Sequence, residues 1–88
     1  MKHLFLVNPA AGKRGSTEAL LRRVEETFSP LGLEHEVVLT SSAGDAERLA
    51  RRAACSGGPV RIYACGGDGT LNEVVNGAAG YPNAAITN

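Results

Sequence analysis

The sequence has 88 residues with nine basic and nine acidic side chains, so its formal net charge is zero. A domain of this size buries about 60–65% of the surface of its unfolded chain, which leaves room for one modest core. Balanced charge, without Lys or Arg clusters beside aromatic residues, argues against nucleic acid as a partner. Apolar residues 4–7 are too few for a signal peptide or a membrane span, so we expect a cytoplasmic protein.

The first predicted element is a strand over residues 4–7, because a continuous apolar run is typical of a parallel strand covered on both faces. Pro9 ends it, since proline cannot donate to a sheet. Ser16 can cap a helix that continues to about Phe28. The predicted apolar face of this helix consists of Leu20, Leu21, Val24 and Phe28.

Residues 33–40 alternate apolar and charged side chains, which predicts a less covered strand near an edge of the sheet. We expect His35 in this strand to be a packing residue rather than a ligand. The segment Ser42-x-x-Asp45 resembles a capping box and predicts the start of a second helix. The apolar positions of that helix are Ala46, Leu49, Ala50 and Ala53.

The remaining predicted elements are a strand over residues 60–65, a helix over 71–79 and the first part of a strand over 84–88. Alternating strands and helices favour right-handed crossovers, and therefore a mostly parallel sheet between two helical layers. The predicted fold class is α/β, with three layers in the order α/β/α. The predicted packing face of the third helix consists of Leu71, Val74, Val75 and Ala78.

The unusual loops of this chain all follow strands. Ligands of open parallel sheets bind beyond the carboxyl ends of the strands. Loops 8–15, 40–44 and 66–70 each begin at such an end, so we expect them to converge on one crevice. Cys55 and Cys65 show neither a CxxC spacing nor a neighbouring His pair, which favours reduced structural thiols over metal ligands.

The most informative segment is the turn Gly66-Gly67-Asp68-Gly69-Thr70, in which a buried strand runs into a helix that we expect to start at Thr70. Glycine can adopt a positive φ and lets backbone N–H groups approach a ligand, and a helix N-terminus attracts negative charge. The amides of Gly66, Gly67, Gly69 and Thr70 are therefore candidate donors to phosphates. The alternative is a tight strand-to-helix turn without a ligand.

Two common phosphate-binding motifs do not fit the sequence. A dinucleotide fingerprint would need a third glycine where Asn72 stands, and a Walker A loop would need Ser or Thr after Lys13, where Arg14 stands. Asp68 is unexpected among amides that face phosphate, unless it faces Mg²⁺ or orients an acceptor hydroxyl. The alternative for Asp68 is a hydrogen bond that only fixes the loop.

The run Gly66-Gly67-Asp68-Gly69-Thr70-Leu71-Asn72-Glu73-Val74-Val75-Asn76-Gly77, together with Asn8-Pro9-Ala10-Ala11-Gly12-Lys13, resembles the catalytic domain of the diacylglycerol and sphingosine kinase family. The resemblance covers essentially the whole chain. It implies ATP and Mg²⁺ as cofactors and a lipid hydroxyl as the acceptor. It also implies Asp68 as a catalytic residue, and a set of cofactor-binding residues: Asn8, Gly12, Lys13, Thr40, Gly66, Gly67, Asp68, Gly69, Thr70 and Asn72.

Several of these residues also have structural interpretations. Lys13 can be a solvated lysine, and Thr40 a β-branched residue that ends a strand. Asn72 and Glu73 fall in the first turn of the predicted third helix, where a carboxylate favours the helix dipole whatever else it does. No set of metal ligands is evident in the sequence.

Members of the family continue into further strands and a β-rich second domain with metal-binding residues and the catalytic carboxylate. The resemblance therefore implies that residues 1–88 are the N-terminal part of the nucleotide-binding kinase domain and are inactive alone. It also implies transient, peripheral contact of the full-length enzyme with the inner membrane face. Because a truncated parallel sheet leaves open edges, we expect a homodimer or edge-to-edge association.

Two other functions are compatible with the glycine turn. The first is a relative of NAD kinases or sugar kinases, in which the acceptor is a polar nucleotide or a sugar. The second is a non-catalytic module that binds a nucleotide or another anion. The Asn-Pro-x-x-Gly-Lys segment argues against the first of these.

Overall fold

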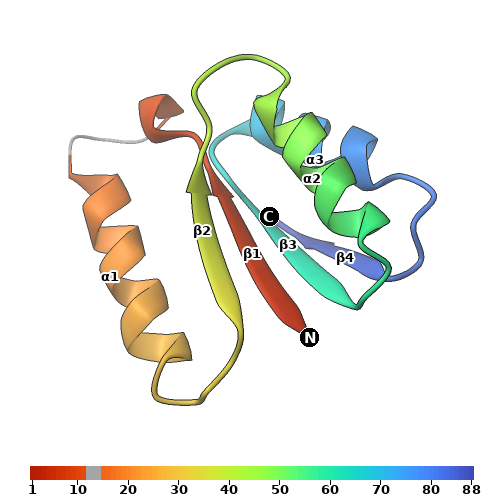
Figure 1. Ribbon diagram of the computed structural model, residues 1–88. Coiled ribbons are helices and arrows are strands. Elements are labelled where there is room, and N and C mark those ends of the chain that lie inside the picture. The colour runs from red at the N-terminus through yellow and green to blue at the C-terminus, as the bar shows by residue number, and fades with distance from the viewer. Residues whose placement is uncertain (12–14) are drawn as a thin grey trace.

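The computed structural model describes residues 1–11 and 15–88. In this part of the chain the strands form one parallel sheet in the order β2-β1-β3-β4 (Figure 1). The strands are β1 (Lys2–Val7), β2 (His35–Leu39), β3 (Val60–Cys65) and β4 (Ala84–Thr87). The helices are α1 (Ser16–Phe28), α2 (Asp45–Cys55) and α3 (Asp68–Ala78), with a short 3-10 turn η1 (Pro9–Ala11) after β1.

The helices cover both faces of the sheet, which confirms the predicted α/β/α layering (Figure 1). On one face Val24 of α1 packs against Phe5 and Val7 of β1. On the other face α2 and α3 cover a larger core that includes Leu6, Ile62 and Val74, and none of these three side chains is accessible to solvent. The alternation of β-strand side chains thus supplies β1 with a core on each side.

The register of the sheet brings the ends of three strands to the same level. Val7 of β1 pairs with Leu39 of β2 and with Cys65 of β3. Immediately beyond these pairs, the amide of Asn8 donates to the carbonyl oxygen of Cys65 at 2.9 Å. The amide of Thr40 donates to the carbonyl oxygen of Val7 at 2.8 Å. The loops after β1, β2 and β3 therefore start side by side, as the sequence predicted.

Helices α2 and α3 lie in close contact because small residues line their crossing. Ala46, Ala50 and Ala54 are buried on α2, and Gly77 faces them from α3. A methyl group on Gly77 would overlap the carbonyl oxygen of Glu47 and lie 3.0 Å from the side chain of Ala50. At this point the two helices are therefore too close for a side chain at position 77.

The helix starts differ from the predictions. Ser16 does not cap α1; the N-cap position belongs to Gly15, which has a φ of 83° and makes no side-chain cap. Gly44 has the same role before α2. The predicted capping box is reversed there, because the carboxylate of Asp45 accepts hydrogen bonds from the amides of Ser41 and Ser42. Helix α3 begins at Asp68, before both Thr70, where the glycine turn was expected to end, and Leu71, where the apolar spacing begins.

Two residues of the predicted packing faces are exposed. Leu21 is 37% exposed on the flank of α1. Val75 is 44% exposed, because the buried face of α3 is formed by Thr70, Val74, Gly77 and Ala78. This face is rotated from the predicted one because α3 packs against α2 as well as against the sheet, and periodicity alone does not reveal a second neighbour.

His35 packs between β2 and α1, with its ring centroid 5.8 Å from that of Phe28. Its Nδ1 lies 2.9 Å from the carbonyl oxygen of Leu33, and its Nε2 lies 3.2 Å from Oε2 of Glu25. Only the imidazolium donates from both nitrogens, so the carbonyl and, second, the carboxylate raise the pKa of His35. The prediction of a packing histidine is confirmed, with an added ionic link to α1.

Both cysteines are reduced, as the sequence predicted. Cys55 and Cys65 are free thiols, and burial raises the pKa of the half-buried Cys65. Over residues 1–11 and 15–88, none of the helices is sufficiently long and apolar to cross a membrane.

Candidate functional site

A cavity of about 330 Å³ opens at the carboxyl ends of β1, β2 and β3. Its walls come from the loop after β1, the loop after β2, the start of α2 and the first turns of α3. Four of the predicted site residues take part. The lining residues are Asn8, Thr40, Ser41, Ser42, Ala43, Ala46, Gly69, Thr70 and Glu73.

The glycine turn presents free backbone donors next to this cavity. Residues 66–69 are exposed, and within the described chain the amides of residues 66–70 donate no hydrogen bond to a protein acceptor. The first bond of α3 runs from the amide of Leu71 to the carbonyl oxygen of Gly67 at 3.1 Å. Unpaired N–H groups at the positive end of a helix dipole are a favourable environment for an anion.

The glycines of this turn are not needed for a positive φ, contrary to our expectation. None of Gly66, Gly67 and Gly69 has one, and Gly67 is extended with a φ of −122°. At Gly66 the reason for glycine is space, because a Cβ there would overlap Oγ1 of Thr70 and lie 3.2 Å from Cβ of Asn8. A Cβ on Gly67 or Gly69 would meet no atom of residues 1–11 or 15–88 within 4 Å. The fold therefore has room for alanine at these two positions.

Asp68 is the first residue of α3 and is exposed. A carboxylate at this position is favoured by the helix dipole. The Asp68 side chain forms no hydrogen bond or ion pair with residues 1–11 or 15–88. A hydrogen bond that fixes the loop is therefore not found in that part of the chain. Its predicted catalytic role stays a prediction. Among the same residues no group of three or more His, Cys, Asp or Glu side chains is placed to hold a metal ion.

Asn8 and Thr40 both tie the loops to the end of β1. Oδ1 of Asn8 accepts the amide of Ala10 at 3.0 Å, which forms the turn into η1. The hydroxyl of Thr40 donates to the carbonyl oxygen of Val7 at 3.3 Å. The structural interpretation of Thr40 is thus present in the fold, and its contact with a nucleotide remains a prediction.

The other predicted residues are not all placed at the cavity. Asn72 is exposed on α3 and does not line it. Gly12 and Lys13 lie outside the described residues. Thr70 is 7% exposed and lines the cavity at the point where α3 leaves the turn.

Sequence reasoning missed two carboxylates here: Glu73, which lines the cavity, and Asp45, which does not line it but binds the lining residues Ser41 and Ser42. Oε1 of Glu73 accepts the amide of Ala46, at the start of α2, at 3.2 Å. The carboxylate of Asp45 accepts hydrogen bonds from Ser41 and Ser42. These bonds, with Ser41 having the larger effect, hold the pKa of the Asp45 carboxyl well below its usual range. The sequence had suggested that Glu73 lies in the first turn of this helix. Because α3 starts at Asp68, Glu73 lies in the second turn instead.

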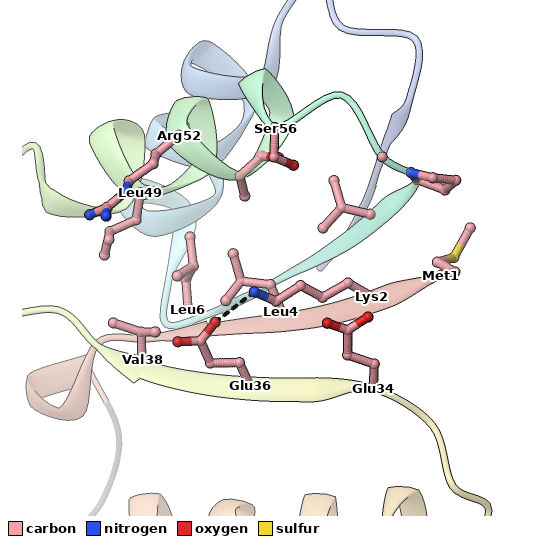
Figure 2. A pocket seen from close by; sticks show the side chains of 14 residues that line it. Met1, Lys2, Leu4, Leu6, Glu34, Glu36, Val38, Leu49, Arg52 and Ser56 are labelled. Atoms are coloured by element: carbon pink, nitrogen blue, oxygen red, sulfur yellow. Dashed lines mark hydrogen bonds and ion pairs between the residues drawn. The ribbon is translucent and has the colours of Figure 1, made fainter.

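A larger cavity of about 630 Å³ lies at the opposite end of the sheet, between α2 and strands β1 and β2 (Figure 2). Leu4, Leu6 and Val38 are among its apolar lining, and Nζ of Lys2 forms an ion pair with Oε1 of Glu36 at 2.9 Å beside it. It contains none of the predicted site residues. We therefore place the functional site at the smaller cavity, where the three loops and the free amides meet.

The structure is an open parallel α/β sheet in which a glycine turn leads from β3 into α3. The family model of the diacylglycerol kinase catalytic domain matches residues 2–87. The chain belongs to the diacylglycerol kinase catalytic domain family. This confirms the resemblance seen in the sequence.

Individual relatives agree with this membership. The chain is 41% identical over 79 residues to a diacylglycerol kinase of Bacillus subtilis, covering 90% of this chain and 25% of that protein. It is 40% identical over 79 residues to sphingoid long-chain bases kinase 1 of Arabidopsis thaliana, covering 86% of this chain and 10% of that protein. A diacylglycerol kinase crystal structure from Bacillus anthracis superposes with a TM-score of 0.62 at 28% identity, over 97% of this chain and 29% of that chain.

The chain therefore spans about a quarter of the bacterial diacylglycerol kinases that it matches, and a tenth of the plant kinase.

Proposed function

We propose that this chain forms the ATP-binding part of a lipid kinase, which transfers the γ-phosphate of ATP to a hydroxyl of diacylglycerol or a related lipid. Membership of the family and the names of its relatives support this class of activity. Because phosphoryl transfer depends mainly on donors around the phosphates, a metal and a positioned hydroxyl, a domain that supplies only the donors is a meaningful part of such an enzyme.

The observation that carries the proposal is the open space above Gly67 and Gly69. Neither glycine has a positive φ, and neither is crowded by the part of the chain that the structure describes. Alanine is the better helix former, so glycine at position 69 of α3 has no advantage for the fold itself. A ligand that must approach the backbone gives both positions a reason to lack a side chain.

The amides of residues 66–70 suit a polyphosphate, because they are several adjacent hydrogen-bond donors at a helix end that attracts negative charge. They have no acceptor among residues 1–11 and 15–88, and they lie at the positive end of α3 in a turn whose residues 66–69 are exposed. Asn8 and Thr40, across the cavity, would contact the rest of the nucleotide. Mg²⁺ would neutralise part of the phosphate charge when bound, and Asp68 is the carboxylate of this turn that could face it or the acceptor hydroxyl.

Titration of the chain with ATP–Mg²⁺ tests the phosphate site. We compare the wild type with Gly69→Ala and with the control Gly58→Ala. Gly58 also lacks a positive φ, and a Cβ there would meet no atom of residues 1–11 or 15–88 within 4 Å. It precedes β3, whereas the turn follows β3, so the two lie at opposite ends of this strand. Gly69→Ala should weaken ATP binding at least tenfold, about 1.4 kcal/mol, while Gly58→Ala leaves binding unchanged.

The stability of the same variants separates binding from folding. Gly69→Ala should raise the free energy of unfolding by up to about 1 kcal/mol, because alanine favours the helix. A variant that is more stable and yet binds ATP poorly would support the proposal. Equal ATP affinity of wild type and Gly69→Ala would refute the proposal that the amides of residues 66–70 bind the phosphates.

Three further parts of the proposal concern the parent enzyme and the chain's associations. We expect no lipid phosphorylation by the isolated chain, and a cytoplasmic enzyme that touches the membrane surface peripherally.

The outer edges of β2 and β4 have no strand partner among the described residues. We therefore expect edge-to-edge association or a homodimer, and a concentration-independent monomer in sedimentation would contradict this.

A further inference from the structure

Glu73 joins the two helices whose N-termini open onto the cavity. It projects from the second turn of α3, and its Oε1 accepts the amide of Ala46 at the start of α2, at a distance of 3.2 Å. Ala46 is 2% exposed, and its amide has no other acceptor within the described chain. This bond is therefore a direct link across the cavity wall, between its α3 side and its α2 side.

The start of α2 is in turn fixed to the loop after β2. Oδ2 of Asp45 accepts the amide of Ser41 at 2.8 Å and the amide of Ser42 at 3.1 Å. The hydroxyls of both serines also donate to this carboxylate. Residues 41 and 42 line the cavity, so the hydrogen bonds of Asp45 connect this part of the cavity wall to the start of α2.

Glu73 also changes which helix N-terminus can receive an anion. At α2 the carboxylate of Glu73 already occupies the amide of Ala46. At α3 the amides remain free of acceptors from the described chain. A polyphosphate therefore finds unpaired amides at the glycine turn, whereas the amide of Ala46 at the start of α2 is already paired.

We propose that Glu73 is a positioning residue for the nucleotide. It holds the start of α2, and with it the Ser41–Ser42 loop, at the distance from the glycine turn that phosphate binding requires. The inference rests on the proposed function, because it assumes that ATP occupies this cavity. Glu73 acts through a hydrogen bond that it accepts, and its negative charge is not required for that bond.

The experiment compares Glu73→Gln, which keeps an oxygen acceptor without the charge, with Glu73→Ala, which removes the acceptor. Glu26→Ala is the matched control, because Glu26 is an exposed glutamate of α1 on the opposite face of the sheet. Should Glu73→Ala be unstable, Glu73→Leu restores the bulk without the acceptor. Hydrogen exchange of the Ala46 amide and the affinity for ATP–Mg²⁺ are measured for each variant.

We expect Glu73→Ala to expose the Ala46 amide to fast exchange and to weaken ATP binding about tenfold. Glu73→Gln and Glu26→Ala should stay within about twofold of the wild type in both measurements. Unchanged ATP binding in Glu73→Ala, or equal losses in Glu73→Gln and Glu73→Ala, would overturn the positioning role alone. Failure of the wild type to bind ATP–Mg²⁺ would overturn the proposed function, and this inference with it.

Discussion

Replacing Gly66 with alanine should destabilise the fold, unlike the same change at Gly67 or Gly69. The new Cβ would overlap Oγ1 of Thr70 and lie 2.9 Å from Cβ of Thr70 and 3.2 Å from Cβ of Asn8. Rotation of the Thr70 side chain cannot relieve the second contact, because Cβ does not move with that rotation. The first turn of α3 or the end of β1 must therefore shift.

The cost follows from overpacking a site that has no spare volume. Thr70 is buried, and strain of this kind costs about 1–3 kcal/mol. For a domain of this length, a loss of about 2 kcal/mol lowers the melting temperature by about 8–16 °C. Thermal and urea unfolding of Gly66→Ala and Gly67→Ala would measure the contrast. If Gly66→Ala is as stable as the wild type, the turn is looser than the structure shows and our explanation of this glycine is wrong.

Two other predictions concern contacts away from the turn. Gly77→Ala should lower the free energy of unfolding by about 1–2 kcal/mol in urea titrations, because overlap with the carbonyl of Glu47 outweighs the gain in helix propensity; a more stable variant would contradict the close helix crossing. The raised pKa of His35, due to a backbone carbonyl and then Glu25, means that its contribution to stability is complete below about pH 6.5 and is lost as the pH rises through the folded-state pKa. The stability difference between wild type and His35→Gln should therefore shrink from about pH 6 to about pH 8, and a difference that grows would refute this link.

Most of the architecture could be predicted because local signals and topology agreed. The apolar run of β1, the alternation in β2 and the helical spacing in α2 each indicate one element, and the βα order leads to a parallel sheet. The convergence of the three loops followed from this order alone. In the fold, the pairing of Val7 with Leu39 and with Cys65 places the starts of these three loops together, as expected.

Details that depend on contacts between elements were not predictable. The crossing of α2 and α3 at Gly77 rotates the buried face of α3 and exposes Val75. The same crossing brings Glu73 to the amide of Ala46, a partner 27 residues away in the sequence. The sequence showed a glycine-rich turn, but only the structure separates Gly66, which makes room for Thr70, from glycines that the fold does not need.

Above all, we propose that the backbone amides between Cys65 and Leu71 bind the phosphates of ATP. Amide NMR spectra of the chain, recorded during titration with ATP–Mg²⁺, test it most directly. We predict that the largest shifts occur at the amides of residues 66–70, with little change at Gly58. Shifts that gather instead around Lys2 and Val60, beside the larger cavity, or the absence of any shift, would contradict the account.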